Sequence, residues 1–217
     1  MTLLQDIENF KKEVLPTIPK DALETITKTS TELIEQNLES KALSHEDVIP
    51  SFMLPDAKGN DVSSEEFLKK GPVVISFYRG GWCPYCNLEL KALQSKLPEI
   101  KALGAELIAI SPELPDYSLT TQEKNALAFP VLSDKDNEVA RKFGLVFDLD
   151  KELIPLFQKV FDWDLVAING SEKVELPIPA TYVVSRDGVI QFAFVNSDYT
   201  QRAEPDKILE VLRRISA

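Results

Sequence analysis

The chain has 217 residues, 44% of them hydrophobic, and a formal net charge of −11 at pH 7. This length and apolar content can bury one substantial core, which favours one main domain with an extension and disfavours a disordered chain. The acidic charge disfavours nucleic acid binding. The sequence has neither a leader pattern nor a stretch near the roughly 20 apolar residues that span a bilayer, so we expect a cytoplasmic protein that does not bind membranes.

The chain contains two cysteines, Cys83 and Cys86, and one histidine, His45. A disulfide between positions this close closes a small loop and stabilises a fold little, so a structural role for the pair is weak. His45 has polar neighbours and is interpreted as a surface residue, and one histidine with two cysteines cannot complete a tetrahedral zinc site. The sequence also lacks a glycine-rich dinucleotide fingerprint, so we expect neither a metal nor an organic cofactor.

Residues 1–44 carry apolar residues at helical spacing in two runs, which Pro16 and Pro19 separate. The pattern predicts two helices that pack on the main domain or on a partner subunit. We therefore assign residues 1–44 to an N-terminal helical extension and residues 45–217 to the main domain, and a homodimer is one interpretation of the extension.

Apolar runs and helical patterns alternate through the main domain, which indicates βαβ units and a central, mostly parallel mixed sheet flanked by helices. The expected strands cover residues 73–78, 105–110, 129–132, 180–184 and 189–195. The expected helices cover residues 63–70, 86–100, 118–127, 137–143, 150–161 and 206–215. Asp187-Gly188 predicts a hairpin between the last two strands. The segment from 147 to 179 has the least regular pattern.

Trp82-Cys83-Pro84-Tyr85-Cys86 joins the first long strand to a helix. A helix N-terminus lowers the pKa of a cysteine, and Pro84 suits the first helical position because it has no N–H. Cys86 shares the apolar stripe of that helix. We therefore expect Cys83 to be an exposed nucleophile and Cys86 a buried resolving thiol that forms a disulfide with it. The plain alternative is a pair of small buried hydrophobic residues.

Residues 77–90, FYRGGWCPYCNLEL, resemble the peroxiredoxin-like redoxins of the thioredoxin superfamily, a group related to alkyl hydroperoxide reductase. Segments 50–56, 129–134 and 179–184 extend the resemblance over roughly residues 46–215. The resemblance implies a thioredoxin-like fold, with Cys83 as the peroxidatic cysteine and Cys86 as the resolving one. It also implies that Pro179 is the cis-proline that lies against the active-site disulfide.

Two positions depart from that family. Gly80 stands where peroxiredoxins place a threonine or serine, and Pro179 where they place an arginine, and both changes weaken a peroxidase assignment. We expect Arg79 and the backbone N–H groups of Gly80, Gly81 and Trp82 to stabilise the thiolate or polarise a peroxide instead. Trp82 has three interpretations: it shields the disulfide, it offers an apolar surface to a partner, or it has a structural role alone.

Arg202 precedes the last expected helix and has two interpretations. It holds an anionic substrate or the thiolate, or it forms a solvated ion pair, and the sequence favours the ion pair.

The leading interpretation is a thiol peroxidase that reduces hydrogen peroxide or organic hydroperoxides and is recycled by a thioredoxin-like or glutathione donor. One alternative is a thiol–disulfide oxidoreductase that acts on protein disulfides, because Cys-Pro-Tyr-Cys also occurs in glutaredoxins. Another is a redox-sensing interaction protein whose N-terminal helices bind a partner. The alternatives differ in whether Cys83 attacks oxygen or sulfur.

Overall fold

The computed structural model describes residues 2–216. The helices are α1 (Leu3–Val14), α2 (Lys20–Glu35), α3 (Ser64–Lys70), α4 (Pro84–Ala102), α5 (Pro115–Lys124), α6 (Glu138–Lys142), α7 (Leu153–Phe161), α8 (Leu165–Asn169) and α9 (Pro205–Ile215). The strands are β1 (Met53–Pro55), β2 (Asp61–Ser63), β3 (Val73–Phe77), β4 (Glu106–Ser111), β5 (Val131–Ser133), β6 (Val146–Asp148), β7 (Glu175–Pro177), β8 (Ala180–Val184) and β9 (Ile190–Val195). Short 3-10 turns are η1 (Leu15–Thr17), η2 (Leu38–Lys41) and η3 (Lys135–Asn137).

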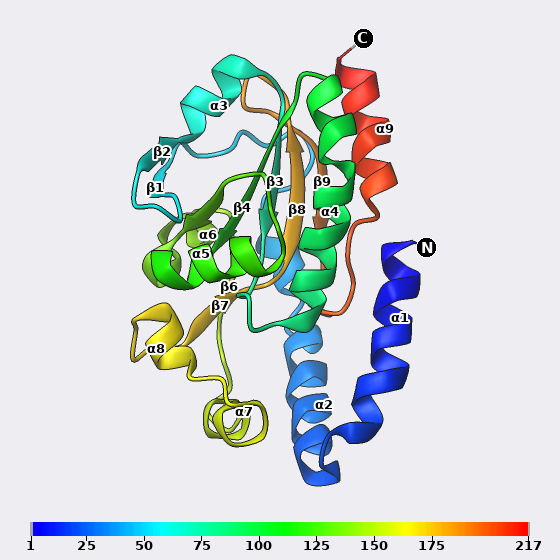
Figure 1. Ribbon diagram of the computed structural model, residues 1–217, viewed down its shortest axis with the longest axis vertical. Helices are drawn as coiled ribbons and strands as arrows, with labels where there is room; N and C mark the ends of the chain where they lie inside the picture. Colours follow the sequence, from blue (N-terminus) through cyan, green and yellow to red (C-terminus); the bar gives the residue numbers. More distant parts are fainter. Residues whose placement is uncertain (1, 217) are drawn as a thin grey trace.

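The centre of the molecule is a mixed sheet of order β5-β4-β3-β8-β9 (Figure 1). β3 pairs in parallel with β4, and β4 with β5, whereas β8 runs antiparallel to both β3 and β9. β8 is therefore the strand of this sheet that opposes the common direction. The predicted mixed α/β sheet and the hairpin of the last two strands are confirmed.

Both faces of the sheet are covered, which explains why every residue of β3 is buried. Val74 points to the face where α4 and α9 pack, and its neighbours Val73 and Ile75 point to the opposite face with α3 and α6. Figure 1 shows this layering. The sheet therefore fixes the start of α4, because α4 begins directly after β3.

The predicted helices and strands of the main domain are present, with bounds that shift by no more than three residues. Among the elements after α3, the sequence missed β6, β7 and α8, which lie in or beside the irregular segment. Each of them is three to five residues long, too short for a periodic pattern to identify.

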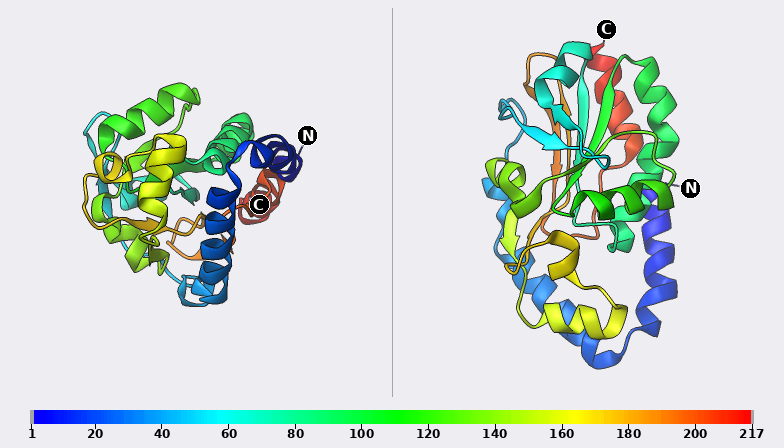
Figure 2. Two further views of the ribbon diagram at one scale, coloured as in Figure 1. Left: turned by 90° about the horizontal axis from the view of Figure 1, so that it is seen from below. Right: turned by 60° about the vertical axis from the view of Figure 1, so that its left-hand side comes forward.

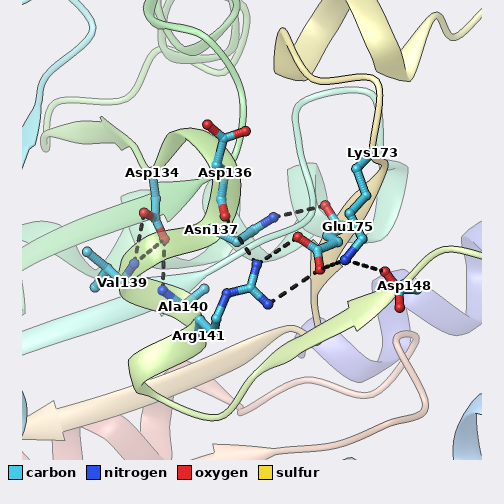
Figure 3. Close-up of polar contacts among 9 residues, drawn as sticks. All are labelled: Asp134, Asp136, Asn137, Val139, Ala140, Arg141, Asp148, Lys173 and Glu175. Atoms are coloured by element: carbon cyan, nitrogen blue, oxygen red, sulfur yellow. Dashed lines mark hydrogen bonds and ion pairs between the residues drawn. The ribbon is translucent and has the colours of Figure 1, made fainter.

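β6 and β7 form a separate antiparallel hairpin that is tied to α6 by polar contacts (Figure 3). Arg141 donates to the Glu175 carboxylate at 2.7 Å, and the Asn137 side chain donates to the Glu175 carbonyl. Lys173 bridges Asp148 and Glu175. These contacts stabilise the β6–β7 hairpin, and the segment between its two strands carries α7 and α8 away from the sheet.

The N-terminal helices pack on the rest of the same chain, α1 against α4 and α2 against α7. A capping box of Thr2 and Gln5 starts α1, and the Glu204 carboxylate accepts the N–H groups of Leu3 and Leu4. Figures 1 and 2 place α1, α2 and α7 at the end of the sheet where α4 begins. No helix within residues 2–216 combines the length and the apolar character that crossing a bilayer requires.

Candidate active site

Cys83 is the N-cap residue of α4, and Pro84 is the first residue of the helix. The Cys83 N–H donates to the Gly80 carbonyl at 3.1 Å, and the Asn87 N–H donates to the Cys83 carbonyl at 3.1 Å. The Asn87 side chain also donates to the Gly81 and Cys83 carbonyls. The predicted strand, turn and helix around the cysteine pair are therefore confirmed, with the Cys83 sulfur at a helix N-terminus.

Both cysteines are free thiols and both are buried, with 1% of Cys83 and 0% of Cys86 exposed. The prediction that Cys83 is exposed is wrong, because α1, α2 and α7 cover the start of α4. Cys83 instead lines a cavity of about 360 Å³, whereas Cys86 does not. Cys83 is therefore the cysteine of the pair that lies beside this cavity.

The cavity walls are mostly apolar and aromatic. Phe10 and Val14 of α1, Ile26 of α2 and Phe157 and Phe161 of α7 contribute to them. On the floor, the Trp82 ring lies 6.1 Å from the Phe157 ring and 5.2 Å from the Trp163 ring. The structure thus gives Trp82 a place between the thiol and the aromatic side chains that follow β6.

The pKa of the Cys83 thiol is lowered to about 6. Burial opposes this shift, but hydrogen bonds from Cys86 and the charges of Arg79 and Arg202 outweigh it. Cys86 shifts the other way: burial and its hydrogen bond to Cys83 raise its pKa well above the usual value. At neutral pH, Cys83 is therefore the thiolate and Cys86 the thiol.

Arg79 is buried and stacks between two aromatic rings, with its guanidinium carbon 4.9 Å from the Trp82 ring and 4.4 Å from the Tyr199 ring. Its Nε has no hydrogen-bond partner, and no carboxylate of residues 2–216 forms an ion pair with it. Arg79 also lines the cavity. Its positive charge is therefore directed at the Cys83 thiolate and at whatever occupies the cavity.

Arg202 lies on the other side of the pair, where its Nη2 contacts the Cys86 sulfur at 3.4 Å. Its Nε is 2.6 Å from Glu89, and both side chains are only 2% exposed. Glu89 accepts a further hydrogen bond from Thr181 at 2.8 Å. Burial raises the pKa of Glu89, although Arg202 and Thr181 oppose the shift. The interpretation of Arg202 as a solvated ion pair is wrong, because the loop before α9 folds it into the core against α4.

Gly80 and Gly81 are required by close packing. Gly80 has a φ of +148°, and a Cβ there would lie 2.2 Å from the Trp82 indole nitrogen and 3.0 Å from Glu113. A Cβ on Gly81 would lie 1.9 Å from the Thr121 hydroxyl. The turn therefore excludes side chains at both positions.

Glu113 is a site residue that the sequence analysis missed. Its carboxylate accepts the Gly81 N–H at 2.8 Å, and the hydroxyls of Tyr78 and Thr121 lie 3.4 Å away. Burial raises its pKa to about 7 against these hydrogen bonds, and the Cys83 charge adds to the rise. Glu113 follows β4, the parallel neighbour of β3, and this adjacency at the carboxyl ends of the strands was the available signal.

Pro179 is buried but is not among the residues that line the cavity. The Ile178–Pro179 bond is trans, so the expected cis-proline is wrong. Ile178 donates to the Leu145 carbonyl, and Ala180 then pairs with Phe77. The chain thus continues from the β6–β7 ladder into the β3–β8 ladder without reversing its direction, and a trans bond allows this course. A substrate-binding role for Pro179 stays a prediction.

His45 is exposed, as expected. Within the described part of the chain, no group of three or more His, Cys, Asp or Glu side chains is placed to hold a metal ion.

Parts of the chain are similar to known proteins. The model of the AhpC/TSA family matches residues 46–193. Peroxiredoxin Bcp of Escherichia coli is 32% identical over 99 residues, which cover 46% of this chain and 63% of that protein. A chloroplastic peroxiredoxin Q of Gentiana triflora is 29% identical over 166 residues, 76% of this chain and 65% of the relative. These matches span less than two thirds of either relative.

Solved structures share the fold. Peroxidoxin BcpB from Mycobacterium tuberculosis superposes with a TM-score of 0.63 at 23% identity and covers 80% of this chain and 98% of its own. Enterococcus faecalis AhpC gives a TM-score of 0.60 at 19% identity, over 78% and 90% of the two chains. The predicted thioredoxin-like fold is confirmed by these likenesses.

Proposed function

Because this chain belongs to the AhpC/TSA family, we propose that it is a thiol-dependent peroxidase that reduces hydroperoxides through Cys83 and Cys86. The observation that carries the proposal is the Cys83 thiol at the N-terminus of α4, with its pKa lowered to about 6 and Cys83 among the residues that line the cavity. A thiolate at neutral pH is the form that attacks a peroxide. The relatives named peroxiredoxin Bcp and peroxiredoxin Q support the same chemistry.

In the first step, the Cys83 thiolate attacks the terminal oxygen of the hydroperoxide. The S–O bond forms and the O–O bond breaks, which gives Cys83 sulfenic acid and an alkoxide that takes up a proton to become the alcohol. Arg79 stabilises the thiolate before this step and the developing negative charge on oxygen during it. The Gly81 N–H already donates to Glu113, so Arg79 and the N–H groups of Gly80 and Trp82 are the donors left for this task.

In the second step, Cys86 attacks the Cys83 sulfur and hydroxide leaves with the Cys86 proton as water, which gives the Cys83–Cys86 disulfide. Two external thiols then reduce this disulfide and are themselves oxidised to a disulfide. We propose a thioredoxin-like or glutathione donor for this step.

The proposal includes the organisation of the chain. Residues 45–217 form the redoxin domain, residues 1–44 are its helical extension, and the protein acts in the cytoplasm without nucleic acid or membrane partners. A homodimer is compatible with this scheme.

The test is stopped-flow tryptophan fluorescence of the reduced protein mixed with hydrogen peroxide and, separately, with a model disulfide. Trp82 reports on the neighbouring thiol. We expect wild-type protein to react much faster than an unactivated thiol, Cys83→Ser to be silent, and Cys86→Ser to stop at a sulfenic acid that dimedone traps. Slow reaction with peroxide but fast exchange with the disulfide would contradict the peroxidase and favour a thiol–disulfide oxidoreductase.

A further inference from the structure

The cavity above Cys83 is built from two parts of the chain. Its floor, with Cys83, Arg79 and Trp82, belongs to the stretch that the family model matches, which begins at residue 46. The segment from α1 through η1 to α2 precedes that stretch and contributes one group of lining residues, which we call the wall. The residues of this wall are Phe10, Val14, Leu15, Ile18, Leu23 and Ile26.

The two parts differ in chemistry. The wall from α1 and α2 is apolar throughout, and Phe157 and Phe161 of α7 oppose it. Cys83 and Arg79, whose Nε has no hydrogen-bond partner among residues 2–216, lie together on the floor. A cavity of about 360 Å³ lies within the roughly 300–1,000 Å³ range of small-molecule sites, where apolar walls bind the body of a ligand and a few polar groups orient it.

An apolar wall does not contribute to the binding of hydrogen peroxide. Its two oxygens bind through hydrogen bonds, which Arg79 and the start of α4 supply, and it buries no apolar surface. An organic group in the same cavity removes apolar surface from water in proportion to its size. The apolar space therefore favours an organic hydroperoxide with a bulky apolar group.

We propose that α1 and α2 are the specificity-determining wall of this site, which selects hydroperoxides with a bulky apolar group and places that group against Val14 and Ile26. This inference rests on the proposed peroxidase function. The covalent step is unchanged: the O–O bond breaks at Cys83, and the apolar group leaves as the alcohol.

The first test measures single-turnover oxidation of the reduced protein by cumene hydroperoxide and by hydrogen peroxide. We expect the wild type to react at least about tenfold faster with cumene hydroperoxide, the size of effect that pocket contacts with apolar groups give. Val14→Phe, which fills the cavity, should lower the cumene rate about tenfold and leave the hydrogen peroxide rate within about twofold. Ile26→Ala should lower the cumene rate alone, by a smaller factor.

Matched controls lie on the outer faces of the same helices. Leu4 on α1 is 51% exposed and Ile34 on α2 is 44% exposed, so Leu4→Phe and Ile34→Ala should leave both rates unchanged. The inference is overturned if Val14→Phe and Ile26→Ala change the two rates by the same factor, or change neither. A wild-type thiol that reacts slowly with both peroxides overturns the peroxidase proposal as well.

A binding measurement tests the role of the wall independently of the reaction at Cys83. The alcohol product, 2-phenyl-2-propanol, carries the same apolar group without the peroxide bond. We expect it to change the fluorescence of Trp82 and Trp163 on titration into wild type and into Cys83→Ser, and to bind at least about tenfold more weakly to Val14→Phe. Equal binding to wild type and Val14→Phe would overturn the proposed role of the wall even if the peroxidase proposal stands.

Discussion

The two sulfur atoms of the site lie within one turn of the same helix and are equally buried, yet their surroundings differ. Cys83 lines a cavity together with Arg79, which forms no ion pair with a carboxylate of residues 2–216. Cys86 faces Arg202, whose charge is balanced by Glu89 at 2.6 Å. The pKa of Cys83 is lowered to about 6, while that of Cys86 is raised.

This comparison shows that burial does not separate the two roles. Both thiols lose hydration, which by itself raises the pKa of each. What separates them is the arrangement of charge and hydrogen bonds. Cys83 accepts hydrogen bonds from Cys86, and the charges of Arg79 and Arg202 both stabilise its thiolate. Cys86 donates to Cys83, and Arg202 is the arginine whose charge lowers its pKa. One sulfur is therefore ready to react, and the other stays protonated until Cys83 is oxidised.

The largest expected effect comes from breaking the Glu89–Arg202 pair on the Cys86 side. Arg202→Met leaves Glu89 buried without its cation, and removing one partner of a buried pair typically costs about 3–5 kcal/mol of unfolding free energy. It also removes a positive charge that lowers the pKa of both cysteines, so sulfenic acid formation and disulfide formation should both slow. Urea unfolding and rapid-mixing fluorescence measure the two effects.

Two controls accompany this variant. Arg213→Met removes an arginine with a 57% exposed side chain from α9 and should cost less than about 1 kcal/mol. The double variant Glu89→Gln/Arg202→Met removes both charges and should recover much of the lost stability. If Arg202→Met and Arg213→Met unfold at the same urea concentration, the buried pair does not stabilise the Cys86 side.

The sequence could predict the parts of the fold that long periodic patterns specify. The buried apolar run predicts β3, and the apolar stripe predicts α4. Together with Pro84, these two patterns place Cys83 at a helix N-terminus. The β6–β7 hairpin could not be predicted, because strands of three residues show no alternation and depend on contacts such as Arg141 with Glu175.

The site was predictable where its residues are neighbours in sequence and hidden where the fold brings distant segments together. Arg79 to Cys86 form one stretch, and the sequence identified them. Glu113 reaches Gly81 only through the pairing of β3 with β4, and Arg202 reaches Cys86 from 116 residues away. The burial of Cys83 depends in turn on α1 and α2, whose packing surface no local pattern specifies.

On the Cys83 side, a negative charge on Glu113 would oppose the thiolate. Its pKa in the folded protein, about 7, lies above the usual 4.5, so its contribution to stability is complete below about pH 4.5 and is lost as pH rises to 7. The loss amounts to about 3.5 kcal/mol at most, from a rise of about 2.5 in the pKa at about 1.4 kcal/mol per pKa unit. Glu113→Gln keeps an acceptor for the Gly81 N–H but does not ionise. Its unfolding free energy should therefore fall less than that of wild type between pH 4.5 and 7, and parallel curves would contradict the buried carboxyl.

The smallest effect, and the one most specific to Cys83, is expected for Arg79→Ala. Arg79 lowers the pKa of Cys83 by its charge, so the variant should have a higher pKa and about a tenth of the thiolate of wild type in mildly acidic solution, since a nearby cation shifts a pKa by about one unit or more. The rate of peroxide oxidation should rise with pH through about 6 in wild type and at a higher pH in the variant. Thiolate absorbance titrated in parallel shows whether the rate follows the pKa.

Arg186, exposed at the hairpin between β8 and β9, provides the control, because Arg186→Ala removes an equal charge far from the thiol. If Arg79→Ala and Arg186→Ala have the same profile as wild type, the asymmetry between the two cysteines comes from the helix N-terminus and the Cys86 hydrogen bonds rather than from the unpaired arginine.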